Sequence, residues 1–300
     1  MACNIEQLLS FLVIHHVLLE SWWCEGCGEL CRKDLSKFAF CCDRRHVIRD
    51  SRRRRKAWRC RYRRSMFTGT WFARSHLSVA KVCEFSCLWL NLPYPRQFLL
   101  KMEIGVSVHT VVNWSSYCRE VCTFWLEKES VVLGGPDVVV EIYEAKLGKQ
   151  RCNTGGWIGG QWFFGGFEPG SKNCFLVPVP SCGSDALLDI IKEWINPGTT
   201  VVSDCWKAYD CLSSEVFVHE SVNHSINFIG PQSGAHTQNS RKTWREVLGG
   251  TPHFGRSKKL AVGYLAEFLF KRKYSHYPDR VHAFFTAVGQ LYSPAPQQSN

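Results

Sequence analysis

Asp204 is a carboxylate at the end of a predicted strand, where it could take part in catalysis or metal binding. It follows the β-branched run at residues 199–203, which predicts a strand, in the segment VSDCWKAY (residues 202–209). Sheets of α/β proteins form their sites from polar groups at strand ends. Further polar residues follow in VNHS (residues 222–225) and HTQNSRKTWR (residues 236–245). Asp204 is therefore a candidate site residue, with polar partners expected downstream.

The segment around Asp204 predicts an α/β unit over residues 136–292. Strands are expected at residues 138–143, 156–167 and 174–179, with the last two forming an antiparallel hairpin. A helix over residues 184–195, with Ser184 as its N-cap, is followed by strands at 199–203 and 215–222, joined by a short helix. Helices are expected at 237–248, 257–273 and 280–292. This order is typical of a ribonuclease-H-like fold.

The N-terminal half has a different composition. Residues 1–20 predict a short helix, and residues 21–75 are rich in Cys, Trp and Arg with little helical period. Residues 76–130 alternate helical patterns with a Pro-containing turn. The tail at 293–300 is rich in Pro, Gln and Ser and is expected to be disordered.

Length and composition exclude several classes of protein. The chain has 300 residues, of which 45% are hydrophobic and 21% charged, as in globular proteins. The longest apolar stretch, residues 8–19, is interrupted by His15 and His16 and lacks a basic leader, so neither a membrane span nor a secretory signal is expected. The sixteen cysteines are scattered, and most are expected to be buried thiols of a reduced, intracellular protein.

The positive charge is concentrated in one segment. Residues 43–64 contain 12 basic and 2 acidic residues and so carry +10 of the net charge of +11. Such a patch indicates a polyanionic partner, most simply nucleic acid. The alternative is a solvated basic loop or a nuclear-import signal, and a nuclear location is expected. The candidate DNA contacts are Arg52, Arg53, Arg54, Arg55, Lys56, Arg59, Arg61, Arg63 and Arg64.

Several blocks together resemble a known family. VVVEIY (138–143), GGQWFFGG (159–166), the Asp204 segment, the HTQN block and LAVGYLAEFLFKRK (260–273) resemble the transposase domain of the Merlin superfamily and its bacterial ISXO2-like relatives. The resemblance implies a DDE transposase, in which three carboxylates hold two divalent metals, Mg²⁺ by preference, at the scissile phosphate of DNA. It also implies double-stranded DNA with transposon-end-like sequences as the partner, and a homo-oligomer.

Two of the three acids implied by the resemblance are replaced. Asp204 matches the second acid, but Tyr143 stands at the position of the first and Arg241 at that of the third. A guanidinium at a site built for a dication opposes metal binding. Neither Glu141 nor Glu144 is a convincing substitute, because Glu141 lies two residues away along the strand and Glu144 points to the other face.

Three further residues lie near the expected site. In the relatives, His224 and His236 are expected to shape the site or touch DNA, and Asn239 to bind a phosphate or water. The alternative for the histidines is a structural role under the sheet. We therefore predict a transposase-derived DNA-binding protein with impaired cleavage. The alternatives are an active Mg²⁺-dependent transposase and a decaying relic.

A zinc site is implied by the same resemblance. Cys24 and Cys27 in WCEGC (23–27), followed by Cys60 in WRC (58–60), resemble the zinc ribbon that precedes the domain in relatives. The fourth ligand is missing from its expected place, and Cys31, Cys41, Cys42 or His46 are left as candidates. The alternative is a decayed ribbon with free thiols.

Residues 102–114 predict a helix-turn-helix. Gly105 supports the turn, Ser107 is a plausible N-cap, and residues 108–120 would form the second helix. Val108, Val111 and Val112 are expected to pack inward, which leaves His109, Thr110 and Asn113 facing DNA.

Overall fold

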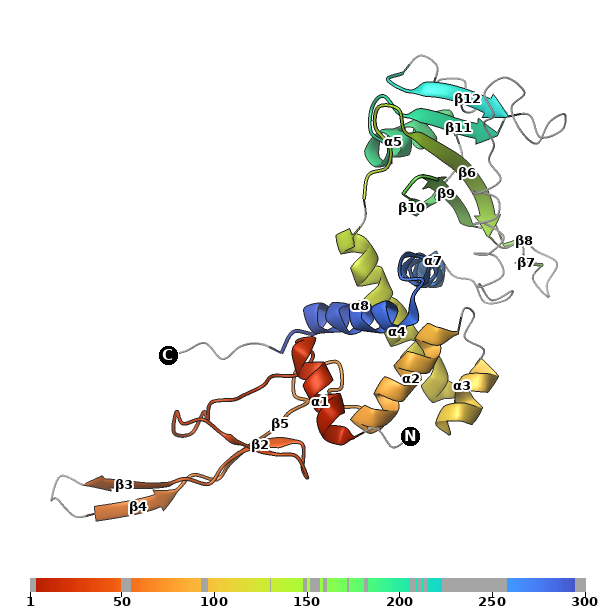
Figure 1. Ribbon diagram of the computed structural model, residues 1–300. Coiled ribbons are helices and arrows are strands. Elements are labelled where there is room, and N and C mark those ends of the chain that lie inside the picture. Colours follow the sequence, from red (N-terminus) through yellow and green to blue (C-terminus); the bar gives the residue numbers. More distant parts are fainter. Residues whose placement is uncertain are drawn as a thin grey trace. The chain divides into compact units, whose positions relative to one another are not determined.

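The computed structural model describes residues 4–49, 55–92, 97–129, 131–147, 150–151, 157–158, 161–171, 173–180, 183–204, 209, 212, 215–222 and 258–294. The chain forms two compact units (Figure 1). One contains Met1–Trp114 with His276–Asn300, and the other contains Ser115–Ser275.

A five-stranded sheet forms the centre of the second unit (Figure 1). Its order is β10 (Cys174–Val179), β9 (Gln161–Phe167), β6 (Val139–Leu147), β11 (Thr200–Asp204) and β12 (Val218–Val222). β11 runs parallel to β6 and β12, whereas β9 runs antiparallel to β6 and β10. The predicted hairpin is thereby confirmed, with a shorter first strand. The two-residue strands β7 (Gln150–Arg151) and β8 (Trp157–Ile158) pair with each other. β8 lies within the strand predicted at 156–167, whereas β7 was not predicted.

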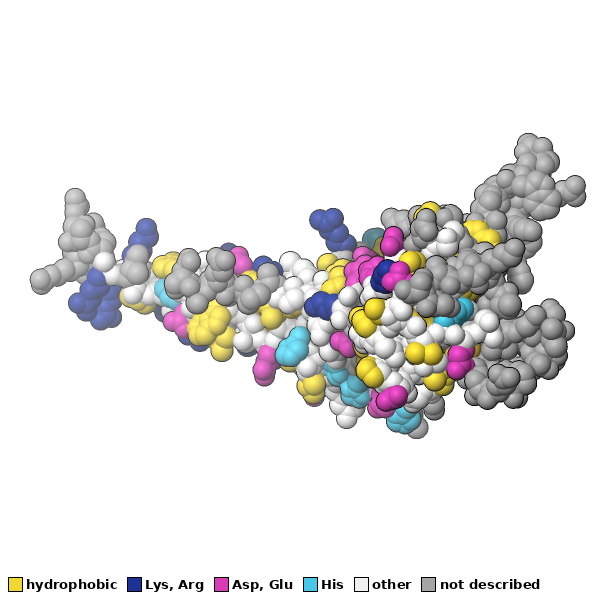
Figure 2. All heavy atoms as spheres, turned by 90° about the horizontal axis from the view of Figure 1, so that it is seen from above, with side chains coloured by type: hydrophobic (Ala, Val, Ile, Leu, Met, Phe, Trp, Pro, Cys, Tyr) yellow, Lys and Arg dark blue, Asp and Glu magenta, His cyan; other side chains and the backbone are white. Residues whose placement is uncertain are grey.

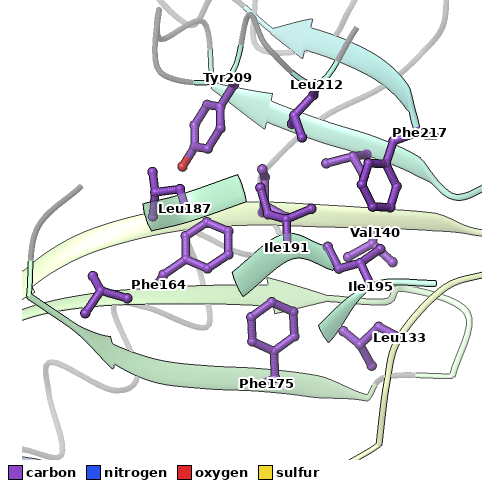
Figure 3. Close-up of a cluster of buried hydrophobic side chains, with 13 residues drawn as sticks. Leu133, Val140, Phe164, Phe175, Leu187, Ile191, Ile195, Tyr209, Leu212 and Phe217 are labelled. Atoms are coloured by element: carbon purple, nitrogen blue, oxygen red, sulfur yellow. The ribbon is translucent and has the colours of Figure 1, made fainter. Parts of the chain in front are cut away.

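Helix α5 (Ser184–Trp194) covers one face of this sheet. Its residues Leu187 and Ile191 pack against Phe164 of β9 and Phe175 of β10 in a buried cluster (Figure 3). These leucine and isoleucine positions recur at helical spacing, which is why this stripe is buried. The helix begins as predicted, but the N-cap is Gly183 and not Ser184, because Gly183 is the last residue with extended backbone.

The second unit also contains the C-terminal part of α4 (Val108–Glu129) and helix α7 (Lys258–Lys273). Arg119 Nε of α4 donates to Glu267 Oε2 of α7 at 2.9 Å, and Lys271 Nζ donates to Glu267 Oε1 at 2.7 Å. All three side chains are at most 15% exposed. The two helices are therefore joined by a largely buried ion-pair triad, in which Glu267 compensates both cations.

The first unit joins the two ends of the chain. Helix α8 (Tyr277–Leu291) packs with α1 (Ile5–Ile14) and α2 (Val79–Asn91). His15 Nε2 and His282 Nδ1 lie 2.9 Å apart, and Arg280 Nη1 donates to the carbonyl of Leu90 at 2.8 Å. A Cβ at Gly289 would lie 2.1 Å from the carbonyl oxygen of His15, so this close approach requires glycine.

The Cys- and Arg-rich segment of the first unit folds as strands. β1 (Arg32–Asp34), β2 (Ala39–Cys42) and β5 (Tyr62–Ser65) form a three-stranded antiparallel sheet. β3 (Arg45–Arg49) and β4 (Arg55–Arg59) pair as a separate hairpin that extends from β2 and β5 (Figure 1). Strand pairing thus explains why the Cys- and Arg-rich segment shows little helical period in the sequence.

The helices predicted from period are found where the structure describes them. α3 (Gln97–Ile104) precedes α4, and α7 and α8 match the predictions at 257–273 and 280–292 to within about three residues. The helix predicted at 237–248 lies outside the described residues. Within the described ranges, no helix is both long and apolar enough to cross a membrane.

Two valines of neighbouring strands test the core of the sheet. Val201 of β11 is 0% exposed, whereas Val218 of β12 is 56% exposed. We expect Val201→Ala to lower the free energy of unfolding by about 2 kcal/mol, through lost burial and a residual cavity. Val218→Ala, the matched control, should change it by less than about 0.5 kcal/mol. Equal losses in urea unfolding would contradict this placement of the core.

Candidate functional site

The strand register places Tyr143 and Asp204 at the same level of the sheet. Val202 of β11 pairs with Glu141 of β6 in a parallel ladder. Asp204 ends β11 two residues later, and Tyr143 lies two residues after Glu141. Tyr143 and Asp204, the two candidate site residues from the sequence that the structure describes, therefore lie on adjacent strands.

The phenol ring of Tyr143 fills space over β9. Tyr143 is 9% exposed and pairs with Gly165, where an added Cβ would lie 2.6 Å from Tyr143 Cζ. Burial raises the pKa of the Tyr143 phenol far above its usual range, and Cys174 adds to the shift. The side chain is therefore neutral at physiological pH and offers no anionic oxygen of the kind that Mg²⁺ prefers. The residues at this position do not fit a carboxylate-held metal.

The two nearby glutamates have different surroundings in the sheet. Glu141 is 1% exposed, one strand repeat away from Tyr143. Glu144 pairs in register with Phe164, and its Oε2 accepts a hydrogen bond from the hydroxyl of Tyr209, a member of the cluster under α5. Glu144 therefore lies on the face opposite to Tyr143, as the alternation along the strand predicts. Arg241, His224, His236 and Asn239 lie outside the described residues.

Four thiols come together in the first unit. The Sγ atoms of Cys24, Cys27, Cys42 and Cys60 all lie within 4.8 Å of one another. Cys24 and Cys60 are 3.4 Å apart, and Cys27 and Cys42 are 3.5 Å apart. A tetrahedral zinc ion with Zn–S bonds of about 2.3 Å holds its sulfurs about 3.8 Å apart. The donor set and its spacing therefore fit zinc.

Local folding explains how distant cysteines meet. The amide of Gly28, at φ +72°, donates to the carbonyl of Cys24 at 2.7 Å and closes the turn that holds the first pair. Cys42 ends β2, and Cys60 lies between β4 and β5, where its amide donates to the carbonyl of Arg44 at 2.8 Å. The thiol cluster therefore lies at the base of the β3–β4 hairpin.

The cluster is enclosed by aromatic and basic groups. Trp22 Nε1 donates to the hydroxyl of Tyr62 at 3.0 Å, and the guanidinium of Arg64 lies 3.9 Å from the centre of the Trp22 ring. Burial raises the pKa of the Cys27 thiol to about 12. At Cys24 burial acts in the same direction, but hydrogen bonds from Cys60 and from the amide of Gly26 leave the pKa below its usual range. Zinc binding must therefore displace protons from the cluster.

The fourth thiol is the one that sequence reasoning left open. Cys42 was one of four candidates, and the pairing of β2 with β5, which sets Cys42 opposite Tyr62, selects it. Cys41, its neighbour, is also buried but points to the other face of the strand. A sequence signal could have found Cys42: it and Cys60 stand just before and just after the two strands of the β3–β4 hairpin, so strand pairing brings them together.

The basic residues of the first unit lie on exposed strands. Arg55, Lys56 and Arg59 are exposed on β4, and Figure 2 shows Lys and Arg side chains gathered at the end of the β3–β4 hairpin. Arg61, just before β5, and Arg63 on β5 are exposed, whereas Arg64 is partly buried against Trp22. Arg52, Arg53 and Arg54 lie outside the described residues.

Helices α3 and α4 are joined by the predicted turn. Gly105 has φ +70°, and Ser107 Oγ accepts a hydrogen bond from the amide of Thr110 at 3.1 Å. His109 and Asn113 are exposed, as predicted, and Thr110 is half-buried. The inward packing of Val108 and Val112 was wrong: they are 46% and 43% exposed. The buried stripe instead runs through Val111, Trp114, Cys118 and Val121, and α4 continues nine residues beyond the predicted end.

Comparisons with known proteins address the second unit. The family described as "ISXO2-like transposase domain" matches residues 144–273, from β6 to the last residue of α7. The "Uncharacterized transposase-like protein" of Haemophilus influenzae is 39% identical over 54 residues, which cover 18% of this chain and 44% of that protein. Residues 144–273 of this chain are therefore similar to an ISXO2-like transposase domain. The match spans less than half the length of that relative, and residue 143 lies just before the matched domain.

A solved structure gives a more distant likeness. It is titled "CryoEM structure of simian T-cell lymphotropic virus intasome in complex with PP2A regulatory subunit B56 gamma". The likeness covers 62% of this chain and 68% of that chain, with 11% identity and a TM-score of 0.29. A likeness this distant says nothing about the partners of this chain.

Adjacent cysteines on β2 test the metal site. We expect the purified chain to contain one zinc ion and Cys42→Ser to lose it, because three thiolates leave the tetrahedral shell incomplete. Cys41→Ser is the matched control and should retain the metal, since Cys41 lies outside the cluster. Zinc content measured by mass spectrometry of the metal decides. Retention of zinc by Cys42→Ser would contradict the assignment.

Proposed function

We propose that this chain is a transposase-derived DNA-binding protein whose phosphodiester cleavage is impaired. The proposal includes a ribonuclease-H-like fold for the second unit. It is supported by the sheet order β10-β9-β6-β11-β12, with β6 parallel to β11 and antiparallel to β9, and by α5 between β10 and β11. The relation to ISXO2-like transposases agrees with this assignment.

The observation that carries impaired cleavage is the burial of Tyr143. Relatives of the DDE type are expected to hold two divalent ions with three carboxylates, one from this strand. Here a neutral phenol packed over Gly165 occupies that strand position, level with Asp204. With Arg241 at the third acid's position, one carboxylate faces the charge of two dications. We infer no catalytic step through metal in the natural chain.

The first unit would bind the DNA. The proposed zinc ion, held by Cys24, Cys27, Cys42 and Cys60, would fix the base of the basic hairpin. The start of α4 would act as the second helix of a helix-turn-helix, with the exposed residues His109 and Asn113 facing the DNA. Double-stranded DNA with transposon-end-like sequences is the proposed partner, and self-association follows only from kinship with transposases.

An active Mg²⁺-dependent transposase is the second candidate. It is favoured by the parallel pairing of β6 with β11, which runs to Val202 and Glu141, and by Asp204 at the end of β11. This candidate requires other carboxylates to complete the metal shell, and Glu141 and Glu144 are placed unfavourably for that role.

A nicking assay separates the two candidates. We expect the natural chain to cut no end-containing duplex in Mg²⁺ or Mn²⁺, because its acids are replaced. The double reversion Tyr143→Asp, Arg241→Glu should restore metal-dependent nicking, since it returns two hard oxygen ligands. Adding Asp204→Ala to the reversion is the control and should abolish the cut. Metal-dependent nicking by the natural chain, lost on Asp204→Ala, would overturn the proposal of impairment.

A further inference from the structure

The β3–β4 hairpin has two chemically different faces. Side chains alternate along each strand, so the directly opposed pairs Arg45–Arg59, Val47–Ala57 and Arg49–Arg55 share one face. His46 and Trp58 share the other face, and Lys56 lies on that face as well. We call the first, with Arg45, Arg49, Arg55 and Arg59 around a small apolar centre, the arginine face.

The second face is occupied by its own contacts. The rings of His46 and Trp58 stack with their centroids 4.5 Å apart and an interplanar angle of 21°. This stack covers part of the hairpin's apolar surface, so that face does not depend on a partner for burial. Lys56 is the basic residue placed there.

The arginine face has the opposite character. Its four arginines are exposed, and like charges set directly opposite each other on a sheet are destabilising. β3 and β4 contain no acidic residue, and the ion pairs nearby, Arg44 with Glu29 and Arg64 with Glu25, lie at the base of the hairpin. A two-stranded ribbon is marginally stable alone. A polyanion against this face would therefore relieve the repulsion that the hairpin carries.

The dimensions of the hairpin select a groove. The major groove of B-DNA is about 12 Å wide and admits a two-stranded ribbon, whereas the minor groove is about 6 Å wide. The Arg45–Arg59 pair and the Arg49–Arg55 pair are four residue steps apart along the strands, a distance of about 14 Å. That distance matches about four base steps of about 3.4 Å each. The major groove of A-form RNA is too narrow for such a ribbon.

We propose that the arginine face lies in the major groove of duplex DNA and donates hydrogen bonds to the N7 and O6 atoms of guanine. This inference rests on the proposed DNA-binding function and adds the element, the face and the groove. Arginine matches these two acceptors with a bidentate fork. Val47 and Ala57, at the centre of the face, leave room for the approach to the bases.

Adjacent residues provide the test. Arg55 lies on the arginine face and Lys56 on the other, and each substitution by Gln removes one positive charge. The probes are two DNA duplexes that share one sequence containing all four bases. One contains guanine and the other 7-deazaguanine, which lacks the N7 acceptor. Affinity is measured by fluorescence anisotropy, with zinc content confirming that each variant retains the thiol cluster.

The natural chain should bind the guanine duplex about tenfold more tightly than the 7-deazaguanine duplex. Arg55→Gln should lower affinity for guanine DNA about tenfold and reduce that preference, whereas Lys56→Gln should keep the preference and lose less than about threefold. Binding without a guanine preference, an equal effect of the two variants, or tighter binding to RNA or anionic vesicles would overturn the inference while leaving a basic patch. Failure of the natural chain to bind any duplex would overturn the proposed function itself.

Discussion

The parallel pairing of β6 with β11 is the constraint on which the second unit depends. It brings residues about sixty positions apart into register, from Thr200 with Val139 to Val202 with Glu141. The same register sets Tyr143 level with Asp204, and it provides the surface on which α5 packs. A site made at these strand ends would depend on side chains from both strands. Under the proposed function, a buried phenol in place of one acid would change the chemistry without changing the fold. The core can therefore persist while the proposed metal site does not.

The four thiols provide a similar constraint for the small first-unit sheets. They join the turn at Cys24 and Cys27 to Cys42 and Cys60, which lie at the base of the β3–β4 hairpin. A structural metal there would stabilise a segment that has little apolar core of its own. The two proposed functions therefore lie in different units: a metal-held basic element for DNA in the first, and a transposase-like domain with an impaired cleavage centre in the second.

The sequence predicted those elements whose local pattern is strong. The β-branched run of β6, the helical stripe of α5 and the apolar period of α7 led to the correct elements. The pattern predicted Ser184 as N-cap and an inward-facing Val108 and Val112 on α4. Both predictions were wrong, because the N-cap is Gly183 and only Val111 of the three valines is buried. Cys42 could not be chosen over Cys41 before the register of β2 and β5 was known. The packing of α8 with α1 could not be predicted from local sequence patterns, because the two helices lie at opposite ends of the chain.

Impaired cleavage requires that Asp204 alone does not hold a pair of divalent ions. Mn²⁺ titration followed by electron paramagnetic resonance measures this directly on the natural chain, without DNA or turnover. We expect no tight site for Mn²⁺ that depends on Asp204, so the natural chain and Asp204→Ala should bind the ion alike. Two tightly bound, spin-coupled Mn²⁺ ions per chain that disappear on Asp204→Ala would contradict it.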